Sequence, residues 1–154
     1  DRYIHNIPCH PLWDDIESES LLVKILYADY REGFAIIEFF GEWNDLFEND
    51  FKLLSENLLS FMIEAGIKRF IFICENVFHI YLESDDYYQA LQEELEEGWI
   101  CVMRMRDEVR EEMEAYHILD YFYYSPIIDE LNWRKLKPFQ LYQIVNERMS
   151  KLLN

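Results

Sequence analysis

Four polar side chains, Glu75, Asn76, His79 and Arg104, are the residues best suited to chemistry in this sequence. Three of them follow one apolar stretch, and Arg104 comes at the end of another. A carboxylate and an imidazole can exchange protons, while an amide and a guanidinium can hold an anion. Because ligands bind beyond the carboxyl ends of parallel strands, we expect these groups at one edge of a sheet. The alternative is a simple turn at Glu75 and Asn76, with His79 packed on apolar neighbours.

A second group of candidates lies near the end of the chain, where Trp133, Arg134, Phe139 and Tyr142 combine aromatic rings with a cation. Aromatic residues and arginine are enriched at the centres of protein interfaces. We therefore expect a surface there for a protein partner or for a second copy that forms a homodimer. The same residues would equally suit the core of a small domain.

His5, Cys9 and His10 carry the side chains that zinc prefers. Adjacent residues such as Cys9 and His10 seldom chelate one ion well, and no second pair of ligands follows, so we predict no metal site. The sequence also contains no phosphate-binding glycine loop, no Gly-x-Ser-x-Gly elbow and no His-Glu-x-x-His motif. We therefore expect no cofactor, and we favour a non-catalytic protein over an enzyme.

The charge of the chain excludes some partners. It has 14 Lys and Arg against 31 Asp and Glu, which gives a net charge of -17. Such a chain repels nucleic-acid phosphates and anionic membranes, so we expect neither as a partner. No apolar run approaches the ~18 residues of a membrane span. A basic partner suits this charge, and an acidic mimic of nucleic acid is a further alternative.

The three cysteines indicate a reducing compartment. Cys74 and Cys101 lie within apolar runs, where a free thiol behaves as a small buried hydrophobe, and three cysteines cannot all pair within one chain. We therefore expect a cytoplasmic protein.

Apolar runs predict four strands. Runs 21–28 and 34–40 flank a polar turn that ends in Gly33, as in a hairpin, and Gly41 is expected to end the second strand. Run 69–74 is apolar on both faces, which predicts a central parallel strand, and 99–105 predicts another. Residues 121–124 are either an edge strand or an aromatic cluster at a helix end.

Helices are expected between and after these strands. The first begins at Asn49 or Asp50 and ends at Gly66, with an inward face of Phe51, Leu54, Leu58, Phe61, Met62 and Ala65. The second begins at Ser84 or Asp85, with Tyr87, Tyr88, Leu91 and Leu95 facing inward. A third runs over 107–119, and the last over 139–153 with Phe139, Tyr142, Val145, Met149 and Leu152 in one stripe.

Together these elements predict a single α/β domain with a mixed, largely parallel sheet of about four to five strands and flanking helices. Residues 1–20 form an N-terminal arm, residues 21–119 the body, and residues 120–154 a helical C-terminal extension.

The body resembles the STAS domain of anti-sigma-factor antagonists. The resemblance rests on the run Phe-Ala-Ile-Ile-Glu-Phe-Phe-Gly at 34–41 and on Phe-Ile-Phe-Ile-Cys-Glu-Asn-Val at 70–77, followed by a loop, a helix and a strand. It implies a non-catalytic protein that binds a partner kinase or a small ligand, often switched by phosphorylation of a serine before the second helix. Ser84 is the nearest match. Acids surround it in place of the family's Asp-Ser-Ser-Gly-like loop, so we predict a helix cap there rather than a phosphorylation switch.

Two hypotheses for function follow. The first is a non-catalytic regulatory or protein-interaction domain. The second is a small enzyme or ligand-binding protein that uses Glu75, Asn76, His79 and Arg104 at the carboxyl edge of the sheet.

Overall fold

The computed structural model describes residues 15–153 of the chain, which fold around one four-stranded sheet in the order β1-β2-β3-β4. Strands β1 (Leu21–Asp29) and β2 (Phe34–Asn44) are antiparallel. Strand β3 (Arg69–Tyr81) lies parallel to β2, and β4 (Trp99–Met103) lies parallel to β3. The predicted fold class, a mixed and largely parallel sheet, is confirmed.

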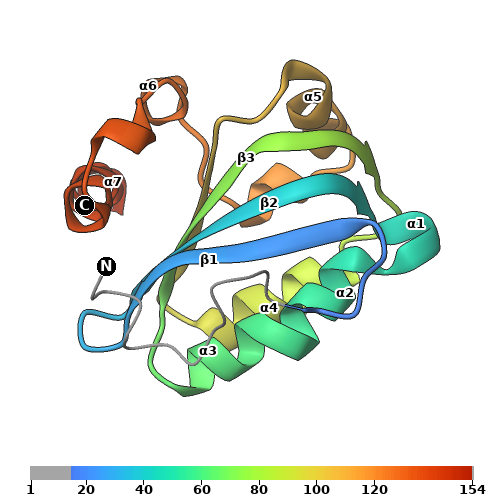
Figure 1. Cartoon of the computed structure of the whole chain (residues 1–154), viewed down its shortest axis with the longest axis horizontal. Helices are drawn as coiled ribbons and strands as arrows, with labels where there is room; N and C mark the ends of the chain where they lie inside the picture. Colours follow the sequence, from blue (N-terminus) through green and yellow to red (C-terminus); the bar gives the residue numbers. More distant parts are fainter. Residues whose placement is uncertain (1–14, 154) are drawn as a thin grey trace.

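Helices cover both faces of the sheet. In Figure 1, α2, α3 and α4 lie on one side of the strands, and α6 and α7 lie on the other. A π-helical turn, Ser55–Leu59, joins α2 to α3, and 3-10 turns lie at Ile118–Tyr121 and Trp133–Lys135. The helices are α1 (Asp45–Glu48), α2 (Asp50–Leu54), α3 (Ser60–Glu64), α4 (Asp86–Leu95), α5 (Asp107–Ala115), α6 (Pro126–Asp129) and α7 (Pro138–Leu153).

The hairpin between β1 and β2 closes as predicted. The side chain of Asp29 accepts hydrogen bonds from the backbone N–H groups of Arg31 and Glu32, at 3.0 and 2.9 Å. Gly33 has a φ of +86° and donates its N–H to the carbonyl oxygen of Asp29 at 2.7 Å. A residue without a Cβ takes this left-handed conformation at little cost.

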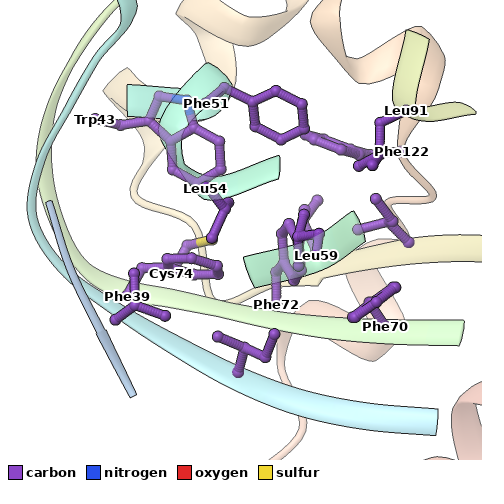
Figure 2. Packing of buried hydrophobic residues seen from close by; sticks show 14 of the residues in the cluster. Phe39, Trp43, Phe51, Leu54, Leu59, Phe70, Phe72, Cys74, Leu91 and Phe122 are labelled. Atoms are coloured by element: carbon purple, nitrogen blue, oxygen red, sulfur yellow. The ribbon is translucent and has the colours of Figure 1, made fainter. Parts of the chain in front are cut away.

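The larger core lies between the sheet and helices α2–α4, and it is rich in aromatic rings (Figure 2). Phe39 of β2 meets Phe72 of β3 edge to face, with ring centroids 4.8 Å apart. Phe51 of α2 stacks on Tyr88 of α4 at 3.9 Å. Aromatic pairs of this geometry contribute about 0.5–1.5 kcal/mol each beyond the burial of their area.

The opposite face of the sheet packs on the C-terminal segment. Phe34 of β2, Ile71 of β3 and Trp99 of β4 are buried there with Tyr142 and Val145 of α7. Strand β3 is therefore covered on both faces, and residues 70–74 are at most 1% exposed. This confirms the prediction of a central, buried strand.

Three strands end well away from the predicted residues. Strand β3 continues to Tyr81, beyond the predicted end at residue 74. Gly41 does not end β2: it takes a φ of +103° at an irregularity in the pairing, and the strand continues to Asn44. The absence of a side chain there is required, since a Cβ would lie 2.5 Å from the carbonyl oxygen of Ser20. Strand β4 ends at Met103 rather than at residue 105, because Arg104 takes a left-handed φ of +61° and turns the chain away.

The π-helical turn changes the inward face of the first helix. Phe51, Leu54 and Met62 are buried as predicted, whereas Phe61 and Ala65 are exposed. A π turn adds one residue, so the face shifts and Leu59 takes the buried position that 3.6-residue spacing assigned to Leu58.

The end of this helix is as predicted. Gly66 has a φ of +115° and donates its N–H to the carbonyl oxygen of Ile63, while Ile67 donates to that of Met62 at 2.9 Å. These two bonds define a Schellman motif.

The last third of the chain is mainly helical. Helix α5 ends at Ala115, earlier than the predicted residue 119, and the chain turns at His117, whose φ is +61°. Tyr123 then pairs with β4 as an isolated bridge, donating its N–H to the carbonyl oxygen of Ile100 at 2.7 Å. Helix α7 confirms the predicted final helix, although Phe139 and Leu152 of its stripe are exposed.

Candidate functional site

A cluster of charged side chains centres on Glu75 of β3, on the face of the sheet that carries α6 and α7. Arg134, in the 3-10 turn before α7, forms an ion pair with one carboxylate oxygen. The other oxygen accepts from Nε of Arg104 at 3.3 Å and from Nε1 of Trp133 at 3.4 Å. The guanidinium of Arg134 also stacks over the Trp133 ring, 4.4 Å from its centroid. Two residues of each candidate group therefore meet at one carboxylate: Glu75 and Arg104 of the first group, and Trp133 and Arg134 of the second.

Asn76 and Glu38 extend this cluster across to β2. The side-chain N–H of Asn76 donates to Oε2 of Glu38 at 3.4 Å, and the Glu38 side chain is buried. Burial raises the pKa of Glu38, an effect that the positive charge of Arg134 opposes. Burial would also raise the pKa of Glu75, but the hydrogen bonds from Arg134 and Arg104 outweigh it and leave the pKa below its ordinary value.

The geometry gives Glu75 the properties of a structural anchor. Its charge is neutralised by two arginines, and its lowered pKa makes it a poor proton acceptor near neutral pH. It joins the C-terminal segment to the centre of the sheet through Arg134 and Trp133.

His79 lies away from this cluster. Strand β3 continues through Glu75 and Asn76 to Tyr81, so the alternative of a turn at these two residues is wrong. A strand rises about 3.3 Å per residue, which places His79 about 13 Å along the strand from Glu75. There its side chain is exposed, and its backbone lies opposite Glu42 in the pairing of β3 with β2.

The four interface candidates have different surroundings. Tyr142 is 3% exposed, stacks on Phe34 with centroids 3.9 Å apart and accepts a hydrogen bond from Arg69 at 2.7 Å, so it is a core residue. Trp133 is half-buried and Arg134 is engaged with Glu75. Phe139 retains a substantially exposed ring.

Sequence reasoning missed a buried polar network at the carboxyl end of β2. The hydroxyl of Tyr88 donates to Oδ2 of Asp45 at 2.5 Å and accepts from Nε1 of Trp43 at 2.8 Å. The other oxygen of Asp45 accepts from the backbone N–H of Phe51 at 2.9 Å, at the start of α2. Burial raises the pKa of Asp45 to about 6, although these hydrogen bonds oppose the shift.

Asp50, beside this network, is fully buried and accepts three hydrogen bonds. The donors are the hydroxyls of Ser18 and Ser20, at 2.5 and 2.6 Å, and the backbone N–H of Asn44 at 2.8 Å. Through these hydrogen bonds, Asp50 joins the chain before β1 to the end of β2. The cluster of Asn and Asp residues directly after an apolar strand was the signal in the sequence for both buried carboxylates.

Ser84 lies in an exposed loop before α4, where the structure corrects the predicted cap. The N-cap residue is Asp85, and its carboxylate accepts from the hydroxyl of Tyr121 at 2.5 Å instead of capping the helix. Ser84 lines a small hollow together with Asp45, Lys52 and Tyr87. Tyr88, Leu91 and Leu95 face inward as predicted, but Tyr87 is exposed, because it lies about 100° around the helix from Tyr88.

Within residues 15–153, no group of three or more His, Cys, Asp or Glu side chains is placed to bind a metal ion. The predicted arm at residues 1–14, with His5, Cys9 and His10, lies outside the described residues. No helix of the described chain is both long enough and apolar enough to cross a membrane.

No protein family and no curated protein matches this chain in sequence. Among solved structures, it is similar to the anti-sigma factor antagonist SpoIIAA in its unphosphorylated form, with a TM-score of 0.51 and 13% sequence identity over 67% of this chain and 87% of that one. It is also similar to the Bacillus cell fate determinant SpoIIAA in the phosphorylated form, with a TM-score of 0.45 and 11% identity over 67% and 90% of the two chains. The first of these likenesses confirms the STAS-like fold.

Proposed function

We propose that this chain is a non-catalytic regulatory domain that acts by binding another protein. The fold supports this proposal, because the solved structure that shares it is described as an anti-sigma factor antagonist. A shared fold alone does not fix function, so the proposal also needs a surface.

Three exposed side chains at the carboxyl end of β2 and the start of α4 supply that surface. Phe47 of the four-residue helix α1 is 74% exposed, and Leu46 beside it and Tyr87 of α4 are also exposed. We call these three residues the α1–α4 surface. Phe47 carries the proposal. Burial of such an exposed phenyl ring by a partner contributes about 1.5–3 kcal/mol to the free energy of binding.

The two described thiols are poorly suited to nucleophilic chemistry. Cys74 and Cys101 are free and buried, and burial raises the pKa of the Cys101 thiol to about 12 and that of Cys74 further. Thiols with such pKa values are poor nucleophiles at neutral pH. Free buried thiols also agree with a cytoplasmic location, which we propose for this protein.

The catalytic hypothesis gains no comparable support. Glu75, its central residue, is neutralised by Arg104 and Arg134, and His79 lies elsewhere on β3. Of the three hollows described among residues 15–153, none is lined by Glu75, Asn76 or Arg104, and His79 lines one of them apart from these three residues.

The test is quantitative affinity capture with the full chain, comparing wild type with Phe47→Ser in extract from the native cell. We expect one protein at near-stoichiometric yield with wild type and at least about tenfold less with the variant. Phe61→Ser is the matched control, because Phe61 is 66% exposed but lies on α3. Identical captured proteins from wild type and Phe47→Ser would contradict the proposal.

Sedimentation of the purified protein tests whether the partner is a second copy of this chain. A concentration-dependent dimer that Phe139→Ser weakens would show that the surface around Trp133, Arg134 and Phe139, rather than the α1–α4 surface, forms a homodimer. A monomer at all concentrations leaves a different protein as the partner.

A further inference from the structure

Strand β3 extends well beyond its neighbour β4. The last pair between them joins Ile73 to Met103, whereas β3 continues to Tyr81 and stays paired with β2 as far as Asn44. Along residues 74–81, β3 thus has a strand on one side only, within the part of the chain that the structure describes. The backbone groups on its other side form a strand edge.

An arginine side chain occupies the first position along this edge. After Arg104 turns the chain away from the sheet, Nε of Arg106 donates to the main-chain carbonyl oxygen of Glu75 at 3.1 Å. The same guanidinium stacks over the ring of Phe78, 4.2 Å from its centroid. Beyond the end of β4, the carbonyl oxygen of Glu75 therefore accepts a hydrogen bond from a side chain.

A groove continues from this position between the β3 edge and α5. Its strand wall is formed by Phe78, His79, Ile80 and Tyr81, and its helix wall by Glu108, Val109 and Glu112. Its volume is about 280 Å³. Phe78 and Tyr81 are 47% and 40% exposed. We call this hollow the β3–α5 groove; Figure 1 shows β3 and α5, the two elements that form its walls.

The chemistry of the two walls selects for a basic, extended ligand. Glu108 and Glu112 are one helical turn apart on the wall that faces the strand edge. Cations pair with such carboxylates and also stack on aromatic rings, as Arg106 does on Phe78. Backbone N–H and C=O groups of a strand edge bind extended peptides as an added strand.

We propose that the β3–α5 groove binds an extended, basic peptide segment of another protein as an added strand beside β3. Lysine or arginine side chains of that segment pair with Glu108 and Glu112, and its backbone pairs with residues 77–81. A second copy of this chain is a poor occupant, because two molecules that each carry a net charge of -17 repel one another. The groove is a second binding surface, separate from the α1–α4 surface and independent of the function proposed for it.

The test uses the peptide acetyl-Val-Lys-Val-Arg-Val-Lys-amide, labelled with a fluorophore, and the full-length protein. Binding is measured by fluorescence anisotropy at low and physiological salt. We expect the double variant Glu108→Gln and Glu112→Gln to weaken binding at least about tenfold. The control double variant Glu93→Gln and Glu97→Gln makes the same charge change on exposed residues outside the groove, and we expect less than about a twofold effect.

A second probe tests strand addition itself. The same peptide with alternate amides N-methylated keeps its charge but cannot form the backbone ladder, so we expect it to bind at least about tenfold more weakly. Backbone amides of residues 77–81 should exchange quickly with solvent in the free protein and slowly with the unmethylated peptide bound. The Phe47→Ser variant should bind the peptide as wild type does, which separates this proposal from the previous one.

Three results would overturn the proposal. Equal losses in the two double variants would show attraction to the overall charge rather than to the groove. Equal binding of the methylated and unmethylated peptides would exclude an added strand. Amides of residues 77–81 that are already protected in the free protein would show that the edge is occupied by the chain itself or by a second copy.

Discussion

At the scale of single residues, the pKa of Asp45 is subject to two opposing effects. Its carboxylate accepts the N–H of Phe51 at the start of α2 and the hydroxyl of Tyr88, which favours the charged form. Its burial favours the neutral form and is the larger effect, since the pKa rises from 3.8 to about 6. Above pH 6 the folded protein therefore holds a charge at a cost in stability.

This raised pKa predicts how stability depends on pH. Between pH 4 and pH 6 the folded state binds the Asp45 proton more tightly than the unfolded state, so this residue's contribution to the unfolding free energy falls as pH rises. Asp45→Asn removes the titration and keeps an acceptor for Phe51. We expect the variant to gain stability relative to wild type by up to about 3 kcal/mol between pH 4 and pH 7. Urea denaturation at both pH values checks this, and a constant difference between the two proteins would contradict it.

Glu75 gives a second prediction at this scale. Glu75→Gln leaves Arg104 and Arg134 without their charged partner and should reduce the unfolding free energy by about 1 kcal/mol, because both arginines are partly exposed to solvent. The loss should shrink as salt is raised. Glu97→Gln, an exposed change of the same kind, is the control and should have little effect. Equal stability of Glu75→Gln and wild type would show that the anchor contributes nothing.

At the scale of elements, β3 determines the architecture, because it contacts a strand on each side and a layer of helices on each face. Ile71→Ala removes a fully buried side chain from the face that packs on α7, and we expect a loss of about 2–5 kcal/mol. His79→Ala, an exposed position on the same strand, should change stability by less than about 0.5 kcal/mol. Chemical denaturation distinguishes the two, and a loss below half a kcal/mol for Ile71→Ala would refute its place in the core.

The elements also show how far the sequence alone could predict this molecule. Strand β3 as far as Cys74 and the Schellman end at Gly66 follow from local patterns, and both were predicted. The continuation of β3 to Tyr81 was not predicted. The π-helical turn adds a residue that no 3.6-residue pattern contains, so Phe61 was assigned to the wrong face. The left-handed φ of Arg104, which ends β4, has no signal in residue type, because arginine rarely adopts it.

The candidate site was also predictable only where it depends on local patterns and on the order of the strands. Glu75 and Asn76 lie on β3 just beyond its last pair with β4, and Arg104 directly follows β4, so the pairing of these two strands brings the residues together. The ion pair with Arg134 depends on the path of the chain from α5 to α7, which no local pattern specifies. Asp45 and Tyr88 are 43 residues apart and meet through the packing of α4 on α2.

At the scale of the whole molecule, charge is unevenly distributed. Residues 131–153 hold five cations against Glu147 alone, a net charge of +4, so the rest of the chain carries -21. The cationic segment packs on the sheet of the acidic body, which attracts it, while the body's own carboxylates repel one another. Because the like charges far outnumber the opposite ones, repulsion is the larger effect.

This balance predicts a response to salt. Raising sodium chloride from about 20 to about 200 mM shortens the Debye length from ~20 Å to ~7 Å and screens the repulsion across the body. We expect the midpoint of thermal unfolding at pH 7 to rise by a few degrees, followed by circular dichroism. A lower midpoint would show that attraction between the C-terminal segment and the body dominates.

The open edge of β3 also has a consequence for solubility. An unpaired strand edge is a template on which identical molecules can stack into aggregates, and residues 74–81 contain no proline that would interrupt such pairing. At neutral pH the net charge of -17 keeps the molecules apart. Near the isoelectric point of about 4.5 that repulsion vanishes while the edge remains. The abundant carboxylates thus protect the protein from aggregation through its own longest strand, and the protection ends in acid.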